Sequence, residues 1–264
     1  MDLGLRDRVA LVMAASKGLG KASAAALAAE GARVTIGARD ARTLERTAQE
    51  IQQATGSRVL AVPTDVTRAE DMEAIVDATA REFGRIDILV NNAGGPPAGK
   101  FDSFGDAQWQ TAFELNLLST VRLIRLVLPH MRKTGSGRII TIVSTSVKQP
   151  IDGLLLSNAI RSGVVGLAKT LSVELAPDNI TVNNVCPGRI LTDRLRQIYH
   201  INERVQQGVS EEAVLKEMAH EIPMGRVGKP EELGAFVAFL ASQQAAYITG
   251  TTTQIDGGLV RSLL

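Results

Sequence analysis

The chain has 264 residues, of which 45% are hydrophobic and 3% aromatic, and its 29 basic and 28 acidic side chains leave a formal net charge of +1. This balance, without a basic block and with few aromatic stacking platforms, argues against nucleic-acid binding. A single cysteine, Cys186, excludes an internal disulfide and a thiolate metal cluster, and we expect no bound metal. The sequence has no long apolar run and no basic region followed by an apolar stretch at its start. We therefore expect a cytoplasmic protein with no membrane span.

Short apolar runs alternate with long amphipathic stretches along almost the whole chain. The runs are rich in Val and Ile, as expected for strands of a parallel sheet that is buried on both faces. Repeated crossovers through helices predict an α/β protein: a single doubly wound Rossmann domain over residues 1–264, with helices on both faces of a seven-stranded parallel sheet. The predicted strands are Val9–Met13, Arg33–Ile36, Arg58–Val62, Ile86–Asn91, Arg138–Val143, Ile180–Val185 and Thr252–Ile255.

Two long helices are predicted in the second half of the chain. From Trp109 to Met131 apolar residues cover most of the helix circumference, which predicts burial on two sides. The helix from about Ser157 to Leu175 carries small residues that permit close approach of another backbone. One face of each helix must pack on the sheet, and the other is available to a second subunit, so we expect a homo-oligomer.

A glycine-containing turn follows the first strand and opens an alanine-rich helix. Glycines at such a turn let the backbone approach a pyrophosphate, whose charge is favoured at the helix N-terminus. The pattern also fits a plain tight turn, but its place after the first strand of an alternating chain favours dinucleotide binding. The turn comprises Ala14, Ser16, Lys17, Gly18, Leu19 and Gly20.

Further motifs follow the later strands. Asp65-Val66 follows the third strand, Asn91-Asn92-Ala93-Gly94 the fourth, and Pro187-Gly188 with Thr192 the sixth; Gly228-Lys-Pro230, Tyr247-Ile-Thr-Gly250 and Asp256-Gly-Gly258 come near the end. In this order and spacing the motifs resemble the short-chain dehydrogenase/reductase family over essentially the whole chain. Within this family, the residues of the motifs are most similar to those of bacterial 3-oxoacyl-acyl-carrier-protein reductase-like members.

The resemblance implies positions around a nicotinamide cofactor. It places Asp65 and Val66 at the adenine, and Thr192, after Pro187-Gly188, beside the nicotinamide carboxamide or a phosphate. Asn92, Ala93 and Gly94 would line the cofactor cleft, although asparagines are also common in turns. One departure concerns the glycine turn, where the family's opening Thr-Gly is Met13-Ala14. Ala14 costs little if its φ is negative, but it implies a slightly wider approach of the pyrophosphate.

The end of the second strand bears on the choice of nicotinamide. NAD-preferring members carry an acid there to accept from the ribose 2′-hydroxyl. This chain has Ala38 followed by Arg39, with Lys17 in the glycine turn. Two cations without a carboxylate suit a 2′-phosphate and favour NADP(H) over NAD. Arg39 also fits a solvated surface charge ahead of Asp40.

The chemical residues match the family only in part. The resemblance implies a serine that polarises the carbonyl, here Ser144, and an asparagine that holds a relay water, here Asn116. The family's Tyr-x-x-x-Lys stands as Ser157-x-x-x-Arg161. A serine hydroxyl is a much poorer acid than a tyrosine with a pKa of about 10. Arg161 can donate to ribose hydroxyls but stays protonated.

Two hypotheses follow. The first is an NADP(H)-dependent oxidoreductase that interconverts a carbonyl and an alcohol with an unconventional proton source: Ser157 with bound water, Lys148 or Tyr199. Tyr199 lies in a stretch that by resemblance forms a substrate lid at about 190–222, where solvent exposure is the plainer expectation, as it is for a loop lysine such as Lys148. The second is a catalytically inactive nucleotide-binding homologue that acts as a sensor or assembly partner. The resemblance implies a homotetramer.

Overall fold

The computed structural model describes residues 2–263 and contains one seven-stranded sheet. All neighbouring strands are parallel, in the order β3-β2-β1-β4-β5-β6-β7. This confirms the predicted doubly wound α/β domain. The strands are β1 (Val9–Met13), β2 (Arg33–Ala38), β3 (Val59–Pro63), β4 (Ile88–Asn91), β5 (Gly137–Ile142), β6 (Ile180–Pro187) and β7 (Thr252–Ile255).

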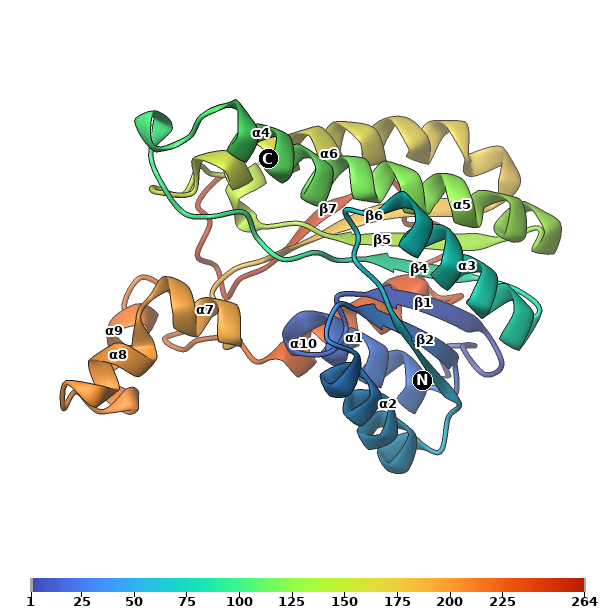
Figure 1. Ribbon diagram of the computed structural model, residues 1–264, viewed down its shortest axis with the longest axis horizontal. Helices are drawn as coiled ribbons and strands as arrows, with labels where there is room; N and C mark the ends of the chain where they lie inside the picture. Colours follow the sequence, from blue (N-terminus) through green and yellow to red (C-terminus); the bar gives the residue numbers. More distant parts are fainter. Residues whose placement is uncertain (1, 264) are drawn as a thin grey trace.

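Helices cover both faces of the sheet (Figure 1). Helices α3 (Ala69–Phe83), α5 (Ser119–Thr134) and α6 (Leu155–Glu174) lie on one face, and α1 (Gly18–Ala29), α2 (Ala41–Thr55) and α10 (Pro230–Ala241) lie on the other.

Burial of strand β1 on both faces explains why polar and apolar residues do not alternate in its sequence. Ala10 and Val12 belong to the apolar cluster beneath α1 and α10, whereas Leu11 and Met13 belong to the cluster beneath α3 and α5. All four are fully buried. Because successive side chains point to opposite faces, a strand covered on both sides must be apolar throughout.

The long helix predicted over Trp109–Met131 is interrupted. Helix α4 (Asp106–Phe113) passes through one π-helical turn (Glu114–Leu118) into α5. A π turn inserts an extra residue and redirects the side chains that follow. In the single chain the outward face of this helical stretch stays partly accessible, with half-buried Val121 and Leu126.

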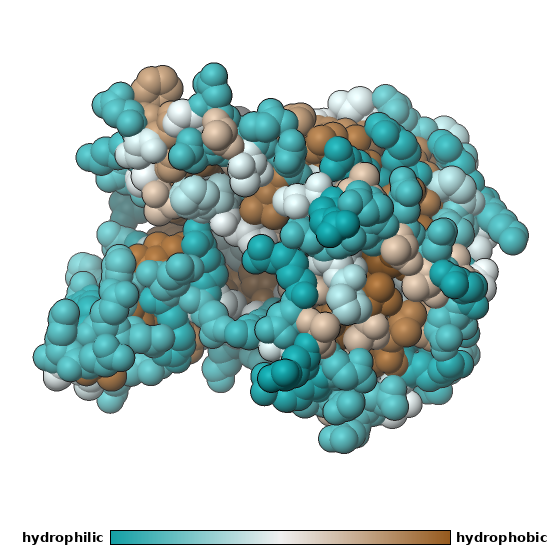
Figure 2. Space-filling view, in the orientation of Figure 1, coloured by the Kyte–Doolittle hydropathy of each residue, from teal (hydrophilic) through white to brown (hydrophobic). Residues whose placement is uncertain are grey.

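Residues 190–222 form a segment of three short helices, which we call the α7–α9 segment. It contains α7 (Asp193–Ile198), α8 (Ile201–Gln206) and α9 (Glu211–Ala219). Figure 1 shows these helices projecting beyond the layers, and Figure 2 shows the surface hollowed between them and the rest of the molecule. Their own apolar cluster, with Leu195, Ile201, Val214 and Met218 buried at its centre, is separate from the two clusters of the sheet.

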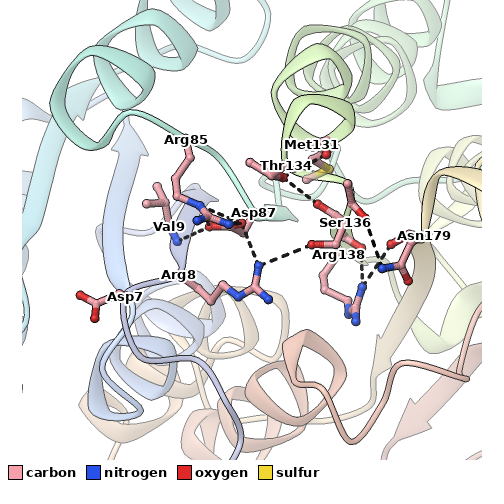
Figure 3. Close-up of polar contacts among 12 residues, drawn as sticks. Asp7, Arg8, Val9, Arg85, Asp87, Met131, Thr134, Ser136, Arg138 and Asn179 are labelled. Atoms are coloured by element: carbon pink, nitrogen blue, oxygen red, sulfur yellow. Dashed lines mark hydrogen bonds and ion pairs between the residues drawn. The ribbon is translucent and has the colours of Figure 1, made fainter.

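A buried carboxylate ties β1 to the start of β4 at the opposite end of the sheet from the carboxyl ends of the strands (Figure 3). Asp87 is 3% exposed and accepts hydrogen bonds from the Val9 amide at 2.9 Å and from Arg8 Nη1 at 3.1 Å. Arg85 donates to the same carboxylate through Nε and Nη2. The acid therefore has a structural role. Across residues 2–263 the helices are all too short or too polar to cross a membrane.

Candidate functional site

The carboxyl ends of β1, β4, β5 and β6 gather most of the predicted site residues. The strand order reverses between β1 and β4, and open α/β sheets bind ligands in the crevice at this point.

The glycine turn after β1 is built as a close-approach surface. Gly18 has φ +54°, a left-handed conformation that glycine adopts without strain. A Cβ on Gly20 would lie 2.3 Å from the Ala14 carbonyl oxygen, so no larger residue fits there. Ala14 itself has φ +47°. Ala14 therefore lacks the negative φ at which an alanine would cost little. It adopts the left-handed conformation that the glycine of the family motif would favour at this position.

Neighbouring polar groups hold this turn in place. The Thr47 hydroxyl donates to the Ser16 carbonyl at 2.9 Å, and the Asn92 side-chain amide donates through Nδ2 to the Ala14 carbonyl at 3.4 Å. Lys17 occupies the N-cap position of α1 without a side-chain capping bond, and Leu19 is half-buried in the first turn of the helix. The helix N-terminus therefore opens toward the crevice.

Arg39 and Asp65 lie near each other beyond β2 and β3. Burial raises the pKa of Asp65, but hydrogen bonds from Thr67 and the charge of Arg39 hold it below its ordinary value. Asp65 Oδ1 accepts from the Thr67 amide at 3.0 Å and from its hydroxyl at 2.8 Å. Arg39 is exposed, and Ala38 at the end of β2 supplies no carboxylate.

A cavity of about 10 Å³, close to the space that one water needs, joins side chains from β4, the π turn and α6. The lining residues include Val66, Asn92, Ala93, Asn116 and Arg161. The π turn directs Asn116 inward, where its Nδ2 donates to the Gly94 carbonyl at 3.0 Å. Its Oδ1 is buried and has no hydrogen-bond partner within residues 2–263.

Arg161 is a buried cation. Its side chain is only 8% exposed, and Nη1 donates to the Ile142 carbonyl at 3.2 Å. Burial, together with the charge of Arg194, lowers the pKa of Arg161 to about 10, so the guanidinium remains charged at neutral pH. Arg161 forms no ion pair with a carboxylate of the described chain.

Three serines lie beyond the carboxyl end of β5 and at the start of α6. Ser144 follows β5 and caps a 3-10 helix (Thr145–Val147), so that its Oγ accepts from the Ser146 amide at 3.1 Å. The Ser146 and Ser157 hydroxyl oxygens lie 3.3 Å apart. Ser157 is 7% exposed and stands one turn before Arg161 on α6. This contact holds both hydroxyls in position, and neither oxygen bonds a charged group within residues 2–263.

The segment after β6 crosses the crevice. Gly188 packs so closely on Asp256 that a Cβ there would lie 2.5 Å from the Asp256 Cβ. Thr192 caps α7 and places its methyl 3.4 Å from where a Cβ of Gly18 would be. Asp193 forms an ion pair with Lys17 at 3.5 Å. Residues that follow Pro187 thus lie over the glycine turn.

Sequence reasoning missed Arg194. Its Nη2 donates to the Pro96 carbonyl at 2.7 Å, across the crevice from α7. No sequence signal separates Arg194 from the other arginines of the α7–α9 segment. The solvent exposure expected for Tyr199 is wrong: it is half-buried against that segment's apolar cluster, with the Arg189 guanidinium 5.4 Å from its ring centre.

Cys186 is fully buried, and burial raises the pKa of its thiol to about 12. It is an unreactive core thiol, as its neighbours Val185 and Pro187 predict.

A doubly wound sheet with a glycine turn at its first strand, and polar side chains gathered where the strand order reverses, defines the class of dinucleotide-binding α/β proteins. Residues 13–260 match the family model described as enoyl-(acyl carrier protein) reductase. The chain belongs to the short-chain dehydrogenase/reductase family and is a family oxidoreductase similar to 3-oxoacyl-acyl-carrier-protein reductases and ketoreductases.

Relatives match over nearly their full length. The 3-oxoacyl-acyl-carrier-protein reductase of Vibrio cholerae is 38% identical, with 97% of this chain and 99% of that protein covered. A short-chain reductase of Streptomyces niveus is 36% identical over 96% of this chain and 94% of its own. L-sorbose reductase of Gluconobacter frateurii, solved with NADPH and L-sorbose, superimposes with a TM-score of 0.95 at 35% identity, with both chains covered completely.

Proposed function

We propose that this protein is an NADP(H)-dependent oxidoreductase that interconverts a carbonyl and an alcohol by hydride transfer. The observation that carries the proposal is that Asn116 and Arg161 line one cavity together with Asn92, whose side-chain amide donates to the Ala14 carbonyl of the glycine turn. Arg161 bonds the carbonyl of Ile142, two residues before Ser144, and faces the same cavity as Asn116.

The residues present fit a phosphorylated dinucleotide. Gly18 and the open N-terminus of α1 suit a pyrophosphate. Lys17 and Arg39 offer positive charge, and no acid stands at Ala38 to favour a free ribose hydroxyl. Relatives solved with NADPH support NADP(H), and we expect NAD(H) to bind less tightly.

The side chains divide the chemistry among them. When bound, the reduced cofactor supplies the hydride. Ser144 accepts from a backbone amide, so its hydroxyl is free to donate a hydrogen bond to the substrate oxygen and polarise the carbonyl. The fixed charge of Arg161 stabilises the negative charge that develops on that oxygen. The unpartnered Asn116 oxygen is placed to hold a water that connects the site to a proton source.

By the resemblance, Ser157 and Arg161 stand where relatives carry tyrosine and lysine. Water held at Ser157 is the proton source that we favour, since Ser157 adjoins Ser146 and Arg161 in the site. Tyr199 is packed into the α7–α9 segment, and Lys148, which is half-buried, remains the alternative.

One observation favours a second function, that of a catalytically inactive nucleotide-binding sensor or assembly partner. Ser157 is buried and bonded to Ser146, and the serine cluster holds no side chain with the acidity of a phenol. Cofactor binding would survive such a change better than turnover.

The first test is a calorimetric titration with NADPH and NADH, followed by NADPH oxidation with diketones, aldehydes, 3-oxoesters and 3-oxoacids. We expect tighter binding of NADPH. Native turnover that is lost in Ser144→Ala supports the enzyme. Turnover gained only in the double variant Ser157→Tyr/Arg161→Lys supports the inactive homologue. Absence of binding to either nucleotide overturns both.

A further inference from the structure

The arginines of the α7–α9 segment divide into two kinds. Two of them pair with glutamates of the same segment, Arg196 with Glu211 and Arg204 with Glu217, and Arg189, just before the segment, pairs with its Glu221. Arg194 instead reaches across the crevice to the Pro96 carbonyl, and its other terminal nitrogen donates to the Gln197 amide oxygen at 3.2 Å.

Arg194 is half-buried, and desolvation lowers its pKa. It forms no ion pair among the described residues.

The short loop after β4 connects Arg194 with the cavity of Arg161. In this loop the Gly94 carbonyl accepts a hydrogen bond from Asn116 Nδ2, and the Pro96 carbonyl accepts one from Arg194 Nη2. Asn116 in turn lines the cavity that Arg161 enters. The two guanidinium groups are close enough for the charge of Arg194 to lower the pKa of Arg161.

Lys148 adds a third cation beyond the carboxyl end of β5, at the end of the 3-10 helix (Thr145–Val147). It lies four residues after Ser144, is half-buried, and is near enough to Cys186 for its charge to oppose the rise in that thiol's pKa. Within residues 2–263 it has no carboxylate partner.

Two acids near the crevice have partners elsewhere. Asp256 accepts from the Gly258 and Val260 amides at 2.9 Å each, and Asp193 pairs with Lys17. Partly or fully buried cations that form no ion pair, as these three do not within residues 2–263, are costly to the folded protein. A ligand that brings negative charge removes that cost, which makes this end of the crevice an anion site.

The cofactor does not account for this site. The groups that suit its phosphates are the glycine turn, Lys17 and Arg39, and Lys17 already pairs with Asp193. Arg161 would serve the ribose and the reacting oxygen. The loop after β4 runs from Asn92, which bonds the Ala14 carbonyl of the glycine turn, to Gly99, which bonds the Gly153 carbonyl. Arg194 contacts this loop between the two points, at Gly95 and Pro96, on the side that leads away from the glycine turn.

We propose that the substrate carries a carboxylate and that Arg194 binds it, with Lys148 providing a second positive charge. The specificity would be for an oxo acid or its hydroxy acid. This inference rests on the proposed function. In the reducing direction the carbonyl carbon takes the hydride and its oxygen takes one proton, so that oxo acid, NADPH and a proton give hydroxy acid and NADP⁺.

The test compares acids with their neutral esters. The probes are 3-oxobutanoate and 4-oxopentanoate, each beside its methyl ester, with native protein, Arg194→Gln and the control Arg204→Gln. Arg204 is also an arginine of the α7–α9 segment, but it pairs with Glu217 away from the crevice. For Arg194→Gln we expect a loss in kcat/KM of about ten- to a hundredfold for the acids and less than about threefold for the esters.

A loosened α7 would lower kcat/KM for acids and esters alike, so equal losses of kcat/KM for the two kinds of substrate overturn the inference. A fall in NADPH affinity in Arg194→Gln, measured by calorimetry, would assign Arg194 to the cofactor pyrophosphate and also overturn it.

The substrate inference can be separated from the proposed function by binding alone. Without turnover, 3-hydroxybutanoate and its methyl ester are titrated into the NADP⁺ complex. Binding of the acid that is lost in Arg194→Gln supports the carboxylate site even though the enzyme proposal has failed. Failure of the acid to bind, or equal binding of the ester, overturns the inference whether or not the protein turns over other carbonyls.

Discussion

Arg161 shows how a single side chain can favour ligand binding at the expense of the fold. It is a charged group that pairs with no carboxylate of residues 2–263, and burial lowers its pKa from the ordinary value to about 10. Between these two values the unfolded chain binds more protons than the folded one, so stability rises with pH there. At neutral pH the charge therefore destabilises the folded, cofactor-free protein.

The variant Arg161→Met should consequently be more stable than the native protein. We expect a gain of about 1–3 kcal/mol in the free energy of unfolding without cofactor, with a loss of at least about tenfold in NADPH affinity. Urea unfolding at pH 7 and calorimetry measure the two effects. Arg81→Met, on the exposed last turn of α3, is the control and should change neither. A destabilised Arg161→Met would show that the guanidinium supports the apo fold.

Ala14 offers a second test at the level of one residue. Its φ of +47° costs an L-residue roughly 1 kcal/mol, whereas glycine adopts this conformation freely but gains entropy when unfolded. We expect Ala14→Gly to raise the free energy of unfolding by about 0.5 kcal/mol. Ala15→Gly, at a neighbouring buried position outside the positive-φ region, should lower it. Thermal unfolding of the two variants should shift in opposite directions.

At the level of elements, the Asp87 cluster joins β1 to the start of β4 far from the crevice. Removing the acid leaves Arg8 and Arg85 without their partner and the Val9 amide without its acceptor. We expect Asp87→Ala to lower the free energy of unfolding by about 2–4 kcal/mol, less than for fully buried cations because both arginines reach solvent. Glu50→Ala, which removes the exposed pair with Lys21, should leave the unfolding midpoint unchanged.

Cofactor affinity should be almost untouched in folded Asp87→Ala, because the cluster lies at the far end of the strands. A selective loss of NADPH binding without a change in stability would contradict this structural role.

The elements also show where sequence reasoning succeeds. The strands Val9–Met13 and Thr252–Ile255 are confirmed residue for residue, and the other five are displaced by only a few residues at one or both ends. Continuous Val and Ile runs bounded by helical stretches leave little freedom in such a sheet. The π turn at 114–118 escaped prediction because apolar periodicity cannot show one inserted residue.

The position of a site residue was predictable only where motif and backbone coincide. Gly18, Asn92 and Ser144 follow β1, β4 and β5, and Asn116 lies in the π turn that lines the crevice, while their roles stay predictions. Arg194 was not predicted as a site residue because its role depends on which way α7 faces. That orientation is set by tertiary packing and not by the local sequence. The burial of Tyr199 depends likewise on the separate packing of the α7–α9 segment.

For the whole molecule, the resemblance predicts a homotetramer. Some outward positions of α4 and α6 are unusually accessible in the single chain, with Phe113 36% and Val173 72% exposed. We expect light scattering on a size-exclusion column to give about four times the mass of one chain. Val173→Asp should lower that mass if α6 forms the contact, whereas Gln53→Asp, at an exposed position of α2, serves as the comparison. A monomeric mass for native protein at micromolar concentration would show the prediction to be wrong.

The separate apolar cluster of the α7–α9 segment has a consequence for how such a protein can change through evolution. Its buried centre shares no residue with the clusters that hold the sheet together. Substitutions there can accumulate, or the whole segment can be exchanged for that of a relative, with little penalty to the Rossmann core. A lineage can therefore acquire new chemical preferences while inheriting the same nucleotide platform.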